Sequence, residues 1–204
     1  MKRTKVILLI LLTFLMVGCQ ESADSISFYS EKADTLKMEF LERALLDKTE
    51  PRILSSKNVL ISNLIISPPL DYYIWVDDES KEVNRIEYLS YYLEEKDTSF
   101  LRKQIKEETG YLTQLSNHGF NILDAKKLWQ EGISVDSIKK IAEQKSGQQR
   151  LFGESKYIMI GKPIFSKDLR KLYLVTAGHN YGKEYIFTIT NDSIERYDLG
   201  QWIE

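Results

Sequence analysis

Cysteine is nearly missing from this chain, which has one, Cys19, among its 204 residues. A lone cysteine close to the start can form no disulfide within the chain and no cysteine-ligated zinc site. Histidine is almost as scarce, with His118 and His179 only, and no H-E-x-x-H pattern occurs. Because metal centres need several clustered ligands, we expect no metal site and no cofactor. The fold must then depend on its apolar core for stability.

The short motifs that mark common active sites are also missing. The chain has no G-x-S-x-G, no G-x-G-x-x-G and no P-loop. Ser137 and Lys140 match the S-x-x-K spacing of serine acylases, but the companion motifs S-D-N and K-T-G do not occur. We therefore interpret Ser137 as part of a helix start. Residues 77–79 are acidic but lack the glycine of a calcium loop, which indicates a solvated turn.

The chain begins with a basic and then apolar leader. Lys2, Arg3 and Lys5 precede residues 6–17, which are apolar except for one threonine and shorter than the roughly 20 residues of a spanning helix. Residues 16–19 are Met-Val-Gly-Cys. This segment resembles the signal peptides of bacterial lipoproteins, whose lipobox ends in Gly or Ala and then Cys, with methionine here where leucine is usual. The resemblance implies cleavage after residue 18 and lipidation of Cys19 by two or three acyl chains, which hold a protein stably at a membrane.

Two alternatives to a lipidated cysteine are an ordinary secretory signal and an uncleaved membrane anchor. Gln20 follows the cysteine, and in related lipoproteins a residue other than aspartate there implies delivery to the outer membrane. We therefore expect a lipid-anchored protein of the cell envelope, at the outer membrane of a Gram-negative bacterium. The predicted organisation is a signal peptide at 1–18, a lipidated cysteine with a polar tether at 19–27, and a single domain at 28–204.

An excess of positive charge is missing from the expected mature chain. Removing residues 1–18 removes three basic residues and no acidic ones, which leaves 25 Lys and Arg against 30 Asp and Glu and a net charge of −5. This balance argues against nucleic acid as a partner and against a basic face that binds an anionic bilayer. We expect the membrane contact to come from the lipid on Cys19.

The C-terminal stretch, residues 157–202, has the pattern of an antiparallel β-meander. Short runs rich in β-branched and aromatic residues alternate there with turn-forming segments. The connections are far too short for the crossover that parallel strands need. In residues 172–177 both alternating faces are largely apolar, so we expect this strand in the middle of the sheet with cover on both faces.

Helical periodicity dominates the chain before the meander, with two β-prone runs at 58–66 and 71–76. Helices are expected over residues 28–46, 83–93, 98–115 with a break near Gly110, 125–131 and 137–146. One apolar stripe runs along the first helix: Ala33, Leu36, Phe40, Leu41, Ala44 and Leu45. Taken in order, the elements predict an α+β fold, in which several helices pack on a mainly antiparallel sheet that ends in the β-meander.

A glycine-bounded turn at residues 178–182 contains the candidate contact residues His179, Asn180 and Tyr181. The glycines permit positive φ and the polar side chains can hydrogen-bond locally, which is typical of a hairpin turn. Alternatively, the loop presents these three side chains to a ligand or partner, because loops on rigid sheets commonly carry function. His118 lies in an Asn-His-Gly segment that we interpret as a loop between elements.

A second candidate surface is aromatic. Tyr88, Tyr91 and Tyr92 form a stripe along one predicted helix, and with Trp75 and Trp129 they could line a sugar or peptide groove. A helix that packs its aromatic face into the core explains the same pattern.

A segment near the C-terminus covers residues 161–175, which read Gly-Lys-Pro-Ile-Phe-Ser-Lys-Asp-Leu-Arg-Lys-Leu-Tyr-Leu-Val. It resembles the end of many uncharacterised lipoproteins of Gram-negative bacteria. Trp202 fits a tryptophan often found near the C-terminus of those proteins. That resemblance implies no established activity. With no catalytic motif and no metal ligands, the sequence favours a non-catalytic binding or interaction domain with an envelope protein or glycan as partner. The alternative is an envelope hydrolase with a dispersed active site.

Overall fold

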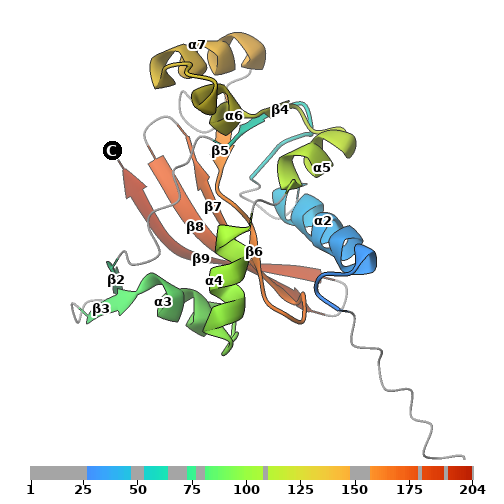
Figure 1. Cartoon of the computed structure of the whole chain (residues 1–204), viewed down its shortest axis with the longest axis vertical. Coiled ribbons are helices and arrows are strands. Elements are labelled where there is room, and N and C mark those ends of the chain that lie inside the picture. The colour runs from blue at the N-terminus through green and yellow to red at the C-terminus, as the bar shows by residue number, and fades with distance from the viewer. Residues whose placement is uncertain are drawn as a thin grey trace, which may run out of the picture.

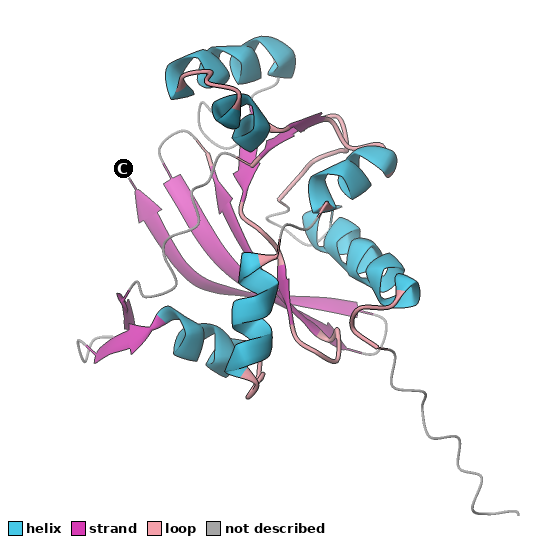
Figure 2. Ribbon diagram, viewed as in Figure 1, coloured by secondary structure: helices cyan, strands magenta, loops and turns pink. Residues whose placement is uncertain are grey.

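The computed structural model describes residues 27–46, 53–63, 73–76, 81–107, 110–147, 157–178, 181–190 and 193–203. The helices in these ranges are α2 (Glu31–Leu46), α3 (Arg85–Tyr92), α4 (Thr98–Lys106), α5 (Tyr111–Asn117), α6 (Ala125–Gln130) and α7 (Val135–Ser146). A seven-stranded sheet has the order β4 (Ile122–Leu123), β1 (Leu60–Ser62), β5 (Tyr157–Ile160), β7 (Lys171–Ala177), β8 (Tyr181–Thr190) and β9 (Ser193–Ile203), with β6 (Ile164–Phe165) beside β7. A separate hairpin joins β2 (Tyr73–Val76) to β3 (Lys81–Asn84). Helices and a curved sheet therefore make an α+β fold (Figure 1, Figure 2), as the sequence predicts.

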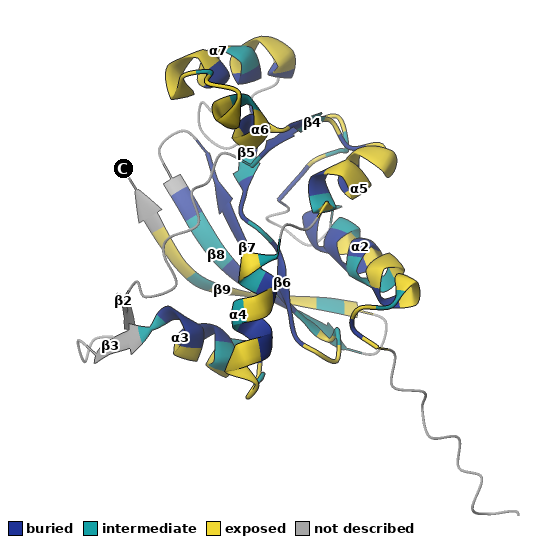
Figure 3. Ribbon diagram, viewed as in Figure 1, coloured by how far each residue is buried: buried dark blue, intermediate teal, exposed yellow. Residues whose placement is uncertain are grey.

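The C-terminal half of the sheet is the predicted antiparallel meander. β5 pairs antiparallel with β7, β7 with β8, and β8 with β9. In β7 every residue after Lys171 is buried (Figure 3), because strands flank it on both sides and helices cover it. The prediction that this strand lies mid-sheet is confirmed.

The other half of the sheet is parallel. β1 pairs in parallel with both β4 and β5, with Ile61 opposite Ile122 on one side and Ile158 on the other. Parallel neighbours need long crossover connections, and here α6 and α7 lie between β4 and β5 in the chain. A small second apolar cluster forms where α7 meets these strands, and it contains Leu60, Leu123, Ala142 and Tyr157.

Helix α2 buries a face that differs from the predicted stripe at one position. Ala33, Phe40, Leu41, Ala44 and Leu45 are buried, but Leu36 is only half-buried and Met38 is buried in its place. Successive helical residues are rotated by about 100°, so Met38 lies beside Leu41 and Leu45, while Leu36 lies at the margin of the face. The buried face is centred further round the helix than the stripe indicates.

Helix α3 begins two residues later than predicted. Val83 and Asn84 belong to β3, which pairs with β2, so the prediction of a helix from residue 83 is wrong at its start. The Asn84 side chain accepts a hydrogen bond from the Ile86 amide at 2.9 Å, which makes Asn84 the N-cap. The strand predicted at 71–76 is confirmed over Tyr73–Val76, and the turn predicted at 77–79 lies outside the described residues.

Local chemistry sets several of the later helix boundaries as predicted, whereas α2 begins at Glu31 and not at Phe28. Asp97 caps α4 and Asp124 caps α6 through side-chain oxygens that accept amide hydrogen bonds. Gly110 separates α4 from α5. Gly132 and Gly147 follow the ends of α6 and α7 with φ of +87° and +64°, a conformation that favours glycine.

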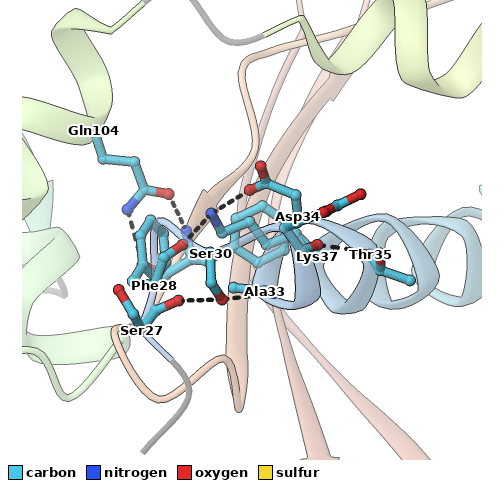
Figure 4. A network of polar contacts seen from close by, with 10 residues as sticks. Ser27, Phe28, Ser30, Ala33, Asp34, Thr35, Lys37 and Gln104 are labelled. Carbon is cyan, nitrogen blue, oxygen red and sulfur yellow. Dashed lines mark hydrogen bonds and ion pairs between the residues drawn. The ribbon is translucent and has the colours of Figure 1, made fainter.

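The first described residues are fixed against two helices. The Lys37 ammonium donates to the Phe28 carbonyl at 2.6 Å and to the Asp34 carboxylate at 2.9 Å, and it lies 3.7 Å from the centre of the Phe28 ring (Figure 4). Phe28 also packs edge-on against Phe100 of α4, with ring centres 4.7 Å apart. These contacts therefore fix Phe28 beside the start of α2.

Candidate ligand-binding site

Three parallel strands end at one edge of the sheet and open into a pocket. Ligands of sheet proteins commonly bind at the carboxyl ends of parallel strands, because the residues that follow them converge there. Asn63 follows β1, Asp124 follows β4, and Lys162 comes two residues after β5. These three residues line a cavity of about 330 Å³, together with residues from α4, α5 and α6.

Hydrogen bonds fix the first two strand ends to each other. The Asn63 amide group donates to Asp124 Oδ1 at 2.8 Å, and its oxygen accepts from the Lys126 amide at 3.0 Å. Asp124 Oδ1 also accepts from the Lys127 amide at 3.0 Å, which caps α6. The carboxylate on the pocket wall is therefore held in one orientation, with its hydrogen bonds from Asn63 and Lys127 on one oxygen.

The third strand end is fixed by a close backbone approach. The Gly161 amide donates to the Val175 carbonyl at 2.8 Å, and a β-carbon at Gly161 would lie 3.2 Å from the Val175 β-carbon. The next residue, Lys162, donates from its ammonium to the Ile105 carbonyl at 3.1 Å and to the Glu107 carbonyl. Lys162 thus stabilises the C-terminal end of α4, where carbonyls lack helical partners.

Tyr111, the first residue of α5, lines the same pocket. Burial raises the pKa of its hydroxyl well above the ordinary value, and the negative charge of Asp124 adds to this effect. The hydroxyl is therefore protonated at neutral pH. In the part of the chain that the structure describes, this hydroxyl makes no hydrogen bond. A half-buried hydroxyl without a partner is costly unless water or a ligand completes it.

The charge of the pocket lining is mainly positive. Its acidic residues are Glu107 and Asp124, and its basic residues are Lys106, Lys126, Lys127 and Lys162. The Glu107 carboxylate also has an external counter-ion, Lys103, at 3.5 Å. A positive rim around a tyrosine hydroxyl suits a small polar ligand that carries a negative group.

Several residue types that are common in nucleophilic catalysis are missing from the lining. Among the described residues that line it there is no histidine, cysteine or serine to act as nucleophile or base. Across the described ranges, no group of three His, Cys, Asp or Glu side chains is placed to hold a metal ion. The arrangement can bind and orient a polar molecule.

The candidate contact residues of the 178–182 turn are only partly placed. Ala177 of β7 pairs with Gly182 of β8, so the segment connects two antiparallel strands as a hairpin does. His179 and Asn180 lie outside the described residues, and Tyr181 is described only as the first residue of β8, opposite Ile203. The predicted contact role of the three residues stays a prediction. Cys19 likewise lies outside the described residues.

His118 lies at the C-terminal end of α5 as part of a surface cluster. Its Nδ1 is 3.1 Å from Glu42 Oε2, and Lys57 Nζ is 2.5 Å from the other oxygen of the same carboxylate. Partial burial raises the pKa of Glu42, but hydrogen bonds from Lys57 and His118 outweigh that effect and hold it below the ordinary value. The cluster joins α2, α5 and the loop before β1, which is a structural role.

Ser137 has a structural role, and the predicted aromatic groove does not form. The Ser134 hydroxyl caps α7 by accepting from the Ser137 amide, so the interpretation of Ser137 as part of a helix start is confirmed. Trp129 on α6 and the tyrosines on α3 lie at opposite ends of the molecule (Figure 1), so they do not form one groove. The Trp75 side chain lies outside the described residues.

A second polar cluster is buried between α3 and the sheet. The Arg85 guanidinium donates to the Tyr173 hydroxyl and lies 3.6 Å from a carboxylate oxygen of Glu184. Burial raises the pKa of Tyr173 and of Tyr88, and the negative charge of Glu184 raises both further. Because Arg85 is only 7% exposed, this cluster fixes α3 to the sheet and offers little access to a ligand.

The pocket could not be found from the sequence by motif. Asn63, Tyr111, Asp124 and Lys162 are spread over 100 residues, and only their positions after strands or at a helix start bring them together. The sequence offers one partial signal, since Asp124 is predicted as the N-cap of a helix and Asn63 is a polar residue inside the β-prone run 58–66.

Comparison with known proteins gives no match, either to a protein-family model, to a curated protein or to a solved structure. Within the described ranges, no helix has the length and apolar character needed to cross a membrane.

Proposed function

We propose that this chain is a lipid-anchored, non-catalytic binding protein of the cell envelope, and that its pocket at the carboxyl ends of β1, β4 and β5 takes a small anionic molecule. The observation that carries the proposal is the Tyr111 hydroxyl, which lines the pocket with no hydrogen-bond partner among the described residues. A ligand that accepts or donates at this hydroxyl would satisfy it.

The charges of the lining support an anionic ligand. Lys106, Lys126 and Lys127 are exposed at the rim, and Lys162 reaches the wall from the end of β5. Asp124 disfavours a negative group beside it, so we expect the anionic group of the ligand toward the lysines and its hydroxyls or amides toward Asp124 and Tyr111. Sugar acids, sugar phosphates and hydroxy acids share this chemistry.

The leader sequence supports attachment to a membrane. Cys19 follows a basic and apolar leader and a small residue, as in lipidated envelope proteins. Residues 20–27 would then link the lipid to Phe28, which the contacts with Lys37 and Phe100 fix to the fold. The nine steps from Cys19 to Phe28 along an extended chain reach about 30 Å, so the domain would stay close to the outer membrane that we propose as its location.

Ligand binding tests the proposal directly. The detergent-solubilised full-length protein would be titrated calorimetrically with glucuronate, glucose 6-phosphate and tartrate, and with glucose and glucosamine as neutral and cationic comparisons. We expect binding of at least one anion and no binding of the comparisons. Tyr111→Phe should weaken that binding by about two- to tenfold, as the loss of one hydrogen bond implies, with an unchanged urea midpoint.

Tyr91→Phe is the matched control, because it removes an exposed hydroxyl on α3, outside the pocket lining. If no anion binds, or if Tyr111→Phe and Tyr91→Phe bind equally well, the pocket is not the ligand site. If instead the protein turns over ester, peptide or glycoside substrates, and Tyr111→Phe lowers that turnover, the hydrolase alternative replaces the binding function.

A further inference from the structure

Two of the most exposed aromatic side chains lie on either side of a third tyrosine, Tyr92. Tyr91 of α3 is 77% exposed and Tyr197 of β9 is 64% exposed. Tyr92 connects them, with ring centres 5.0 Å from Tyr91 and 6.5 Å from Tyr197, the latter in a stacked arrangement. Tyr88 supports Tyr92 from the buried side at 4.7 Å. We call Tyr91, Tyr92 and Tyr197 the aromatic patch.

The patch lies beside an outer strand of the sheet. β9 has 11 residues, and in the part of the chain that the structure describes it pairs with β8 alone. Its side chains are mostly exposed or half-buried, in contrast to the buried β7 (Figure 3). An outer strand offers a row of backbone donors and acceptors to which an extended peptide can add as a further strand.

Acidic side chains surround the patch. Glu87 is one helical turn before Tyr91, Glu94 is two residues after Tyr92, and Glu195 is two residues before Tyr197 on the same side of β9. The Glu94 carboxylate is 75% exposed although it lies 2.7 Å from the Lys171 ammonium, which is itself only 18% exposed. The acid therefore faces solvent and its counter-ion faces the protein. Arg196 points to the opposite side of β9, toward Asp198 and the Tyr185 ring.

We propose that β9 and the aromatic patch dock an extended, lysine- or arginine-bearing segment of a partner protein. The segment adds to the outer edge of β9 as a strand and places its basic side chains over Tyr91 and Tyr197. Tyrosines are enriched at protein interfaces, and cations bind to the faces of aromatic rings. The acidic residues around the patch complement the basic side chains and disfavour acidic partners.

The same features disfavour a second copy of this chain as the occupant. Antiparallel pairing of β9 with the β9 of a second copy would place the Glu195 side chains of both copies on the same face of the joined sheet, and like charges across strands are destabilising. The pairing of β8 with β9 is also irregular, with a bulge between Glu184 and Tyr185. Charges and bulges of this kind are common on outer strands that do not self-associate.

The test uses two labelled decapeptides, one alternating arginine and valine and one alternating glutamate and valine. Fluorescence anisotropy with the detergent-solubilised full-length protein should show binding of the basic peptide only, and this binding should weaken as salt is raised. Tyr91→Ser combined with Tyr197→Ser should weaken it by roughly tenfold or more. Glu87→Gln, Glu94→Gln and Glu195→Gln together should reduce both the affinity and its salt dependence.

Trp129→Ser is the matched control, because Trp129 is a 58% exposed aromatic residue on α6, outside the patch, and its loss should change nothing. Amide hydrogen exchange should show protection of β9 when the basic peptide binds. Absence of basic-peptide binding, equal binding of the acidic peptide, or equal loss in Trp129→Ser would overturn the docking surface. Binding without protection of β9 amides would overturn strand addition. The Tyr111→Phe variant should bind the peptide normally, so this test is independent of the pocket.

Discussion

The guanidinium of Arg85 donates a hydrogen bond to the hydroxyl of Tyr173, which connects the first residue of α3 to the middle of the sheet. Glu184 of β8 completes the cluster at 3.6 Å from Arg85. Buried charges are tolerated when they are paired, but the loss of one partner leaves the other without compensation. The position of α3, and with it the aromatic patch, therefore depends on this cluster.

Arg85→Ala is expected to lower the free energy of unfolding by about 3–5 kcal/mol, because it removes the partner of the buried Tyr173 hydroxyl and the counter-ion of the half-buried Glu184 carboxylate. Urea unfolding measures the loss. The double variant Arg85→Met and Glu184→Gln should recover a substantial part of it, since the uncompensated charge is then gone. A near-neutral single variant would show that Arg85 does not fix α3.

Two leucines test how the core is placed. Leu174 in β7 is fully buried, so Leu174→Ala should cost about 2–5 kcal/mol. The apolar stripe of the first helix places Leu36 in the core as well, but Leu36 is only half-buried in α2. Leu36→Ala should therefore cost no more than about 1–2 kcal/mol. Equal shifts of the urea midpoint for the two variants would contradict this placement.

Local chemistry made much of the fold predictable. The alternating apolar residues of β7, the caps at Asp97 and Asp124, and the glycine after α6 each act within a few residues of the chain. Such signals need no knowledge of the tertiary structure. The start of α3 was misplaced because Val83 continues the helical spacing while its pairing with Ile74 makes it a strand residue.

These local signals do not predict the parallel half of the sheet or the pocket at its edge. Ile61 pairs with Ile122 and Ile158, which are 61 and 97 residues away in the chain. No turn or spacing encodes such pairings, because they depend on how the crossover segments pack. Asp124 was recognised as a helix cap, but its place beside Tyr111 and Asn63 follows only from the strand order.

The cluster of Glu42, Lys57 and His118 predicts a pH dependence. The pKa of Glu42 lies below its ordinary value of 4.5 because the hydrogen bonds from Lys57 and His118 outweigh the effect of burial. A carboxyl whose pKa is lower in the folded chain than in the unfolded chain stabilises the fold above its unfolded pKa. That contribution is lost as the pH falls through the folded pKa.

Glu42→Gln should therefore lower the free energy of unfolding by about 0.5–1 kcal/mol at neutral pH. The difference from the parent should decline as the pH falls below the ordinary pKa of 4.5 and vanish once the pH is below the lower pKa of the folded chain. Urea unfolding over a series of pH values from neutral to acidic measures this. Lys57→Met should show the same trend, whereas a difference that stays constant with pH would mean that Glu42 acts through packing alone.

Lipidation at Cys19 is the prediction on which the proposed location depends. Cys19→Ala removes the only thiol of the chain, so it should abolish labelling by an alkyne fatty acid and leave a precursor that keeps residues 1–18. Ser22→Ala, a matched small change in the tether, should be labelled and processed like the parent. Gln20→Asp should keep the lipid but move the protein from the outer to the inner membrane fraction, because aspartate after the cysteine favours retention. Equal labelling of Cys19→Ala and the parent would contradict lipidation. Labelled Gln20→Asp that still fractionates with the outer membrane would contradict only the role of Gln20 in sorting.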